Sequence, residues 1–165
     1  MHKISINFLV NELRYSQSDI CLIKSLEALD ERFSPQIFCQ EIAKPPVLTQ
    51  LPIYPMYHAQ NLRNDGPKAI WFANNWRCLA ALRNLAKYNV CCNKYFYVDC
   101  PSYLYVHERR YFLNILEAYR NEFEIITSCK KYHDDLVNLG CNVLSDTIDN
   151  YNHEQLSQFV LSKVN

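Results

Sequence analysis

The chain has 165 residues, of which 49% are hydrophobic and 13% aromatic, and its 17 basic and 17 acidic residues give a net charge of zero. This composition predicts one globular domain over residues 1–165 and excludes a disordered chain. The zero balance, with no basic stripe, argues against nucleic acid or an anionic membrane as a bulk electrostatic partner. It favours association with another chain or with copies of itself.

The beginning of the sequence does not resemble a targeting or membrane segment. Its apolar run is seven or eight residues long and contains Ser5 and Asn7, so it is too short and too polar for either. Eight cysteines are scattered without the spacing of a disulfide framework or a zinc site. We therefore expect reduced, mostly buried thiols, no bound metal, no membrane span and a cytoplasmic location.

Strands and helices alternate along the chain. The expected strands, read from apolar alternation or short apolar runs, cover residues 3–10, 36–40, 51–56, 69–73, 95–98, 124–127 and 142–144. The expected helices, read from apolar residues at helical spacing, cover about 16–30, 76–88, 107–120, 128–139 and 152–162. The rest of the proline-rich stretch 43–67 reads as loop.

Several residues mark where these elements begin and end. Ser16 or Ser18 is placed to cap the first helix, and Ser34-Pro35 to end it. Ser128 is expected to cap the fourth helix and Gly140 to terminate it. The alternation predicts an α/β, Rossmann-like, doubly wound fold. It has a mostly parallel sheet of about six strands, with helices on both faces.

Polar side chains follow two of the expected strands. Asn74 and Asn75 come directly after strand 69–73, and Asp99 follows strand 95–98. Ligands in open α/β sheets bind at the carboxyl ends of the strands, so these residues are candidate site residues. Asp99 is either a base that orients a hydroxyl or a helix cap. The asparagines either bind a ligand through their amides or, for Asn75 above all, cap the next helix.

Two further residues are candidates at the same edge. Trp76 either stacks on a ligand or packs against the core. Arg14, in the loop after the first strand, either pairs with a phosphate or stays exposed in solvent. The mid-helix run His133-Asp134-Asp135 lacks matched ligands, so it is expected to be a solvated helix surface.

Three stretches resemble the N-terminal half of GT-B glycosyltransferases, in particular the retaining, family-4-like group. The first joins strand 3–10 to Leu26-Glu-Ala-Leu29 and Phe33-Ser-Pro-Gln-Ile-Phe38. The second joins Ala69-Ile-Trp-Phe-Ala-Asn-Asn-Trp76 to Lys94-Tyr-Phe-Tyr-Val-Asp99. The third runs from Ile125-Ile-Thr-Ser128 through Leu139-Gly140 to Asp146-Thr-Ile-Asp149.

The resemblance implies an acceptor-side domain of a glycosyltransferase, possibly one subunit of a split enzyme. Asp99 would be its catalytic residue, and Arg14, Asn74, Asn75 and Trp76 would bind substrate. A nucleotide-diphosphate sugar would be the donor substrate, with no metal and no other cofactor. A partner chain, or a homo-oligomer, would then supply the donor-binding half, which this chain does not contain.

Two departures from that family, the glycine-free loop after the first strand and the missing donor-binding half, keep a second function open. The loop after the first strand, residues 11–18, has no glycine, whereas the family usually has a glycine-rich turn there. The whole chain has only two glycines, and it has twelve tyrosines, a residue type enriched at protein interfaces. The alternative is therefore a degenerate Rossmann-like domain that acts as a non-catalytic interaction or regulatory module.

Overall fold

The computed structural model describes residues 2–14, 16–42, 49–60, 69–85, 93–99 and 108–164. Its strands are β1 (Ile4–Leu13), β2 (Phe33–Ile42), β3 (Ile53–Pro55), β4 (Ala69–Ala73), β5 (Asn93–Val98), β6 (Glu124–Thr127) and β7 (Val143–Thr147). Its α-helices are α1 (Gln17–Glu27), α2 (Leu79–Asn84), α3 (Arg109–Tyr119), α4 (Lys130–Asn138) and α5 (His153–Val164). Three short 3-10 helices are η1 (Met56–Gln60), η2 (Trp76–Cys78) and η5 (Asp149–Tyr151).

The seven strands form one sheet in the order β3-β2-β1-β4-β5-β6-β7, and every neighbouring pair is parallel. The predicted α/β Rossmann-like fold is confirmed, with seven strands in place of about six. The strand expected over 51–56 is the short edge strand β3, which pairs with β2 over only three residues. Strand β4 lies at the centre of the order, with β1 beside it.

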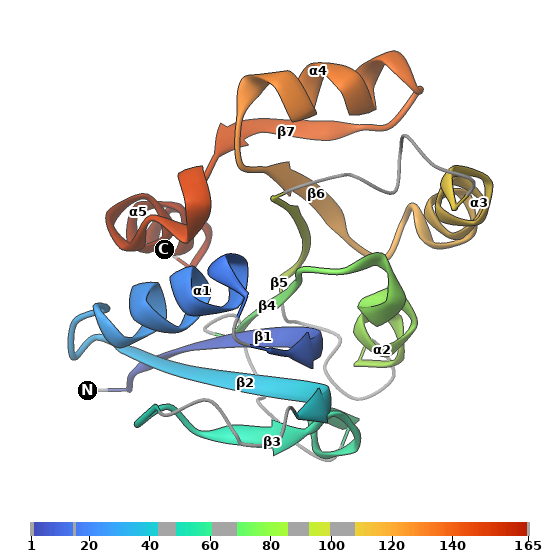
Figure 1. The fold of residues 1–165 in the computed structure, drawn as a ribbon. Helices are drawn as coiled ribbons and strands as arrows, with labels where there is room; N and C mark the ends of the chain where they lie inside the picture. The colour runs from blue at the N-terminus through green and yellow to red at the C-terminus, as the bar shows by residue number, and fades with distance from the viewer. Residues whose placement is uncertain are drawn as a thin grey trace.

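Helices cover both faces of the sheet (Figure 1). On one face, α1 and α5 pack over alternate residues of the central strands, among them Ile6, Phe8 and Phe72. On the other face, α2, α3 and α4 pack over the intervening residues, among them Leu9, Trp71 and Phe96. Strand β4 is buried along its whole length, as expected of a parallel strand covered on both sides.

Strand β2 begins earlier than predicted. Ser34-Pro35 does not end a helix but lies within β2, where Pro35 pairs with Ile6 of β1. Proline is tolerated there because β3 reaches β2 only from Ile37 onward, so the side facing β3 needs no N–H at Pro35. Phe33 is the first residue of the strand.

The helix ends follow the sequence signals in part. Ser16 is the N-cap of α1, and its side chain accepts a hydrogen bond from the backbone N–H of Asp19. Gly140 follows α4 with a φ of 87°, a left-handed conformation that suits glycine. The N-cap of α4 is Cys129, not Ser128, because the Ser128 hydroxyl donates instead to the backbone oxygen of Asp99.

Some predictions fall on residues that the structure does not describe. Residues 43–48 and 61–68 make up most of the proline-rich stretch. Residues 86–88 end the helix expected over 76–88, and residue 107 begins the helix expected over 107–120. Within the described ranges, no helix is long and apolar enough to cross a bilayer.

Candidate functional site

The strand order places a switch point between β1 and β4. From β1 the chain continues through β2 to β3 on one side, then crosses to β4 on the other side of β1. The helix that follows β1 packs on one face of the sheet, and the helix that follows β4 packs on the opposite face. Such divergence opens a crevice at the carboxyl ends of the two strands, where doubly wound proteins bind ligands.

Asp99 lies one residue beyond β5, at this carboxyl edge. Its carboxylate accepts a hydrogen bond of 2.7 Å from the hydroxyl of Ser18, in the first turn of α1. Its backbone oxygen accepts the bond of 2.9 Å from Ser128, which follows β6. Residues of two other elements, α1 and the end of β6, therefore hold Asp99 in place, and Asp99 is only half-buried.

Asn74 follows β4 directly and forms a second hydrogen-bonded pair at this edge. Its amide Nδ2 donates to the hydroxyl of Tyr151 at 3.2 Å. Desolvation by burial raises the pKa of the Tyr151 phenol well above the usual value, and the charge of Asp99 raises it further, while nearby Ser18 acts to lower it. Two hydrogen-bonded pairs, Ser18–Asp99 and Asn74–Tyr151, thus lie next to each other, and these four residues are called here the edge network.

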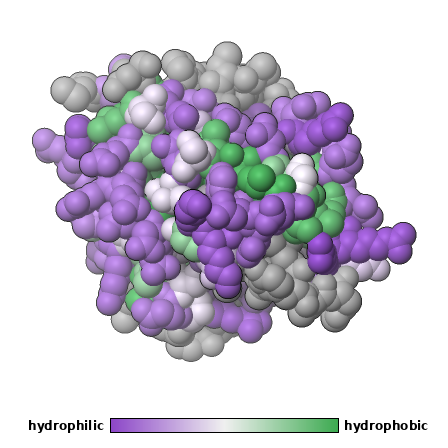
Figure 2. All heavy atoms as spheres, turned by 90° about the horizontal axis from the view of Figure 1, so that it is seen from above, coloured by the Kyte–Doolittle hydropathy of each residue, from purple (hydrophilic) through white to green (hydrophobic). Residues whose placement is uncertain are grey.

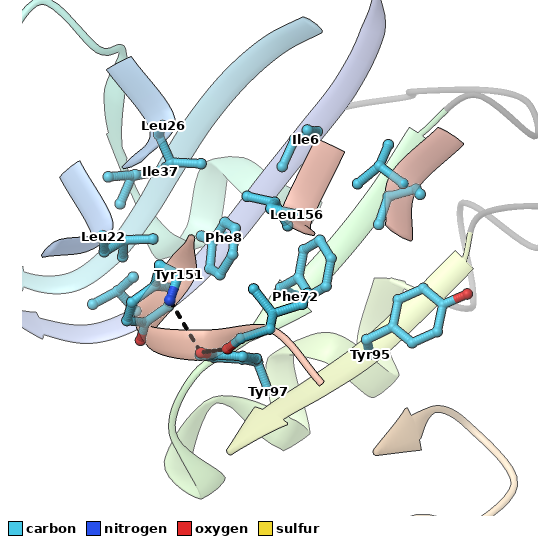
Figure 3. Close-up of a cluster of buried hydrophobic side chains, with 14 of the residues drawn as sticks. Ile6, Phe8, Leu22, Leu26, Ile37, Phe72, Tyr95, Tyr97, Tyr151 and Leu156 are labelled. Atoms are coloured by element: carbon cyan, nitrogen blue, oxygen red, sulfur yellow. Dashed lines mark hydrogen bonds between the residues drawn. The ribbon is translucent and has the colours of Figure 1, made fainter. Parts of the chain in front are cut away.

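The segment that carries Tyr151 is itself tightly held. The hydroxyl of Tyr97 donates to the backbone oxygen of Ile148 at 2.5 Å and accepts from the backbone N–H of Tyr151 at 3.2 Å. Figure 3 shows this second bond and the two phenol rings together, with centroids 4.7 Å apart. Tyr151 has a left-handed φ of 58°, which costs energy for a residue with a side chain.

The loop after β1 is built around Asp19. Its carboxylate accepts from the backbone N–H of Arg14 at 2.7 Å, and only 9% of the residue is exposed. Desolvation raises the pKa of Asp19, and the nearby charges of Asp99 and Glu12 raise it further. The guanidinium of Arg14 is itself paired with Glu12 at 2.5 Å and is largely exposed. Backbone hydrogen bonding to a carboxylate thus shapes this glycine-free loop.

Asn75 and Trp76 lie beside the edge network without joining it. Asn75 caps η2, since its side chain accepts from the backbone N–H of Arg77 at 2.9 Å. Trp76 is half-buried under the guanidinium of Arg77, which lies 4.7 Å from its ring centre and is paired with Glu108. The indole N–H of Trp76 is buried and has no acceptor among the described residues.

The structure therefore brings together two of the predicted site residues, Asp99 and Asn74. It places Arg14, Asn75 and Trp76 around the switch point with partners of their own. Sequence reasoning missed Ser18 and Tyr151, which complete the network. Ser18 was considered only as a helix cap, and nothing in the pattern around Tyr151 indicates that its ring crosses to the end of β4.

The described residues offer no group of three or more histidine, cysteine, aspartate or glutamate side chains arranged to hold a metal ion. A cavity of about 340 Å³ lies at the opposite, amino edge of the sheet, where Asn93, Asn121 and Asn142 line it. Another of about 390 Å³ lies between α3 and the end of α4, lined by apolar residues that include Leu113 and Leu139.

The face shown in Figure 2 is mostly hydrophilic, with small hydrophobic patches. Comparison of the chain with protein-family models, with curated proteins and with solved structures found no match. Its function therefore has to be argued from the fold and from the residues at the switch point.

Proposed function

We propose that this chain is the acceptor-side half of a GT-B-type glycosyltransferase and works with a second chain that carries the donor-binding half. The observation that supports this most is the edge network. A carboxylate, a hydroxyl, a phenol and an amide from four different elements meet at the switch point. These groups are suited to hydrogen-bonding a sugar hydroxyl, and the carboxylate can accept its proton as the new bond forms.

The charges at this edge favour an acceptor over a donor diphosphate. Glu12 and Asp99 both lie close enough to Asp19 for their charges to raise its pKa, and Arg14 is already paired with Glu12. A diphosphate here would meet carboxylates where it needs cations or free backbone N–H groups. The nucleotide-diphosphate sugar is therefore assigned to the partner chain, and an uncharged hydroxyl acceptor to this one.

The test is the Asp99→Asn variant, assayed with a chain that carries a donor-binding half, a nucleotide-diphosphate sugar and an acceptor. The amide keeps the shape of Asp99 and can still accept from Ser18, but it removes the charge. We expect turnover to fall roughly a hundredfold or more if the carboxylate acts as base, with an unchanged melting temperature. Asp146→Asn, on the exposed part of β7, is the matched control and should keep full activity.

The second candidate is a non-catalytic interaction module. One observation favours it: Asp99 and Asn74 already have hydrogen-bond partners within the chain, as purely structural groups would. In that case Asp99→Asn would leave any activity of the assembled complex unchanged, since an amide satisfies Ser18 equally well. An unaltered rate in the variant would lead us to prefer this function over the transferase.

A further inference from the structure

A row of aromatic rings runs from the core of the protein to its surface beside β3. Ring centres are separated by 5.3 Å between Trp71 and Phe38, 5.5 Å between Phe38 and Tyr54, 6.1 Å between Tyr54 and His58, and 4.6 Å between His58 and Tyr57. The first two residues are completely buried, whereas Tyr54 is 36% exposed and Tyr57 63% exposed. The outer three residues, Tyr54, Tyr57 and His58, are called here the aromatic platform.

The platform is held by the core rather than by a loose loop. Tyr54 lies in β3 and is paired in register with Phe38. Tyr57 and His58 lie in the 3-10 helix η1. Met56 and Ala59 of the same helix are buried in the hydrophobic cluster that contains Trp71. Exposed aromatic rings that are fixed in this way lose little freedom when a ligand stacks on them, so they are suited to binding.

The platform lies toward the same edge of the sheet as the edge network. In the register of the sheet, Pro55 of β3 pairs with Cys39 of β2, and Cys39 pairs with Val10 of β1. On the other side of β1, Leu9 pairs with Ala73 of β4, and Asn74 follows Ala73 directly. Helix η1 begins at the next residue, at the carboxyl end of β3 (Figure 1). Four strand spacings separate β3 from β5, or about 19 Å along the edge. A ligand that reaches from the platform to Asp99 must be several sugar rings long.

We propose that the aromatic platform is a binding subsite for an uncharged oligosaccharide. Its remote sugar rings stack on Tyr57 and Tyr54, while its reacting end lies at the switch point. Sugar rings have a C–H face that packs on aromatic rings, and their hydroxyls can bond to the phenol oxygens and the imidazole of His58. The choice of a glycan rests on the proposed function.

The subsite can be tested on this chain alone, with no donor and no partner. Linear hexasaccharides of glucose, N-acetylglucosamine and rhamnose, and the matching monosaccharides, are titrated at millimolar concentration and followed by saturation-transfer NMR. We expect a hexasaccharide to bind and its monosaccharide to bind far more weakly. Tyr57→Ala should weaken binding about tenfold, the loss expected of one stacked ring.

The matched control is Tyr111→Ala, because Tyr111 is 65% exposed but lies on α3, away from the platform. It should bind as the native protein does. Absence of binding for every hexasaccharide, or equal loss in the two variants, would overturn the subsite. So would self-association that Tyr57→Ala abolishes, measured by sedimentation, because the rings would then form a protein interface.

The outcome is separable from that of the proposed function. If Asp99→Asn abolishes transfer while Tyr57→Ala leaves the KM for a long acceptor unchanged, the transferase stands and the subsite fails. If glycans bind through Tyr57 but Asp99→Asn has no effect on transfer, the subsite stands and the catalytic assignment fails.

Discussion

Tyr97 links the last part of the chain to the central sheet through one hydroxyl. That hydroxyl bonds to the backbone oxygen of Ile148 and to the backbone N–H of Tyr151, and both of these residues are buried. Buried backbone groups that lose a partner cost far more than the net gain of an ordinary hydrogen bond. The position of Tyr151, and with it the edge network, therefore depends on Tyr97.

We predict that Tyr97→Phe lowers the free energy of unfolding by about 1–3 kcal/mol, because two buried backbone groups lose their partner. The measurement is urea unfolding followed by circular dichroism. Tyr95→Phe is the matched control, since Tyr95 is a buried neighbour on β5 whose hydroxyl has no hydrogen-bond partner among the described residues. Burial raises the pKa of Tyr95 to about 12, so both phenols stay neutral in the assay. Equal effects of the two variants would contradict the role given to Tyr97.

The buried carboxyl group of Asp19 makes the stability of the fold depend on pH. Desolvation raises its pKa above 3.8, so between 3.8 and the raised value the folded chain binds more protons than the unfolded chain. The contribution of Asp19 to stability therefore falls as the pH rises through that window. Asp19→Asn removes the buried charge and can still accept from the N–H of Arg14.

We expect Asp19→Asn to gain stability relative to the native protein as the pH rises above 3.8, and to keep that gain at neutral pH. Melting temperatures from pH 3.5 to 7.5 measure it. Asp134→Asn should instead lose stability relative to the native protein as the pH rises. The hydrogen bond with His133, and to a smaller extent that with Lys130, lowers the pKa of Asp134. That contribution is present above pH 3.8 and is lost as the pH falls. If the difference in melting temperature between Asp19→Asn and the native protein did not change with pH, Asp19 would not have a raised pKa in the folded state.

At the scale of elements, the end of α4 depends on backbone conformation alone. Gly140 has a φ of 87°, and a Cβ added there would meet no atom within 4 Å. A substitution is therefore penalised by the left-handed backbone and not by a clash. This was readable from the sequence, because a glycine just beyond a helical apolar pattern is the usual stop signal.

We predict that Gly140→Ala lowers the free energy of unfolding by about 1–2 kcal/mol, the cost of the left-handed conformation for a residue with a Cβ. Gly140→Asn should cost less, because asparagine tolerates this conformation better than other side chains. Chemical denaturation of the three proteins measures both values. A larger loss for asparagine than for alanine would mean that side-chain crowding, not backbone strain, decides at this position.

Other element boundaries were not readable in this way. Ser34-Pro35 has the form of a helix stop, yet it lies inside β2 because β3 pairs with only part of that strand. Ser128 has the form of a helix cap, yet its hydroxyl bonds to Asp99 on the neighbouring strand end. In both cases a contact with a distant segment overrides the local preference, and local preferences are weak by comparison.

At the scale of the whole molecule, the order of the strands explains why the candidate residues lie where they do. The switch point between β1 and β4 places the loop around Arg14 opposite Asn74 and Asn75, and β5 adds Asp99 one strand further along. The carboxylates gathered there distinguish this edge from a phosphate-binding one. A glycine-free loop agrees with the proposed function, in which the diphosphate is bound by the partner chain and does not approach this backbone.

The sequence by itself determined the fold class, the buried central strand and the position of Asp99 and Asn74 at strand ends. It did so because these follow from apolar periodicity and from the place where each run stops. It also indicated that Asn75 caps the next helix, which the structure confirms. Only the tertiary structure decided that Ser18 bonds to Asp99, that Tyr151 bonds to Asn74 and that Arg14 pairs with Glu12. Tyr151 lies 77 residues from Asn74, and a hydrogen bond across that separation depends on packing, which no local pattern records.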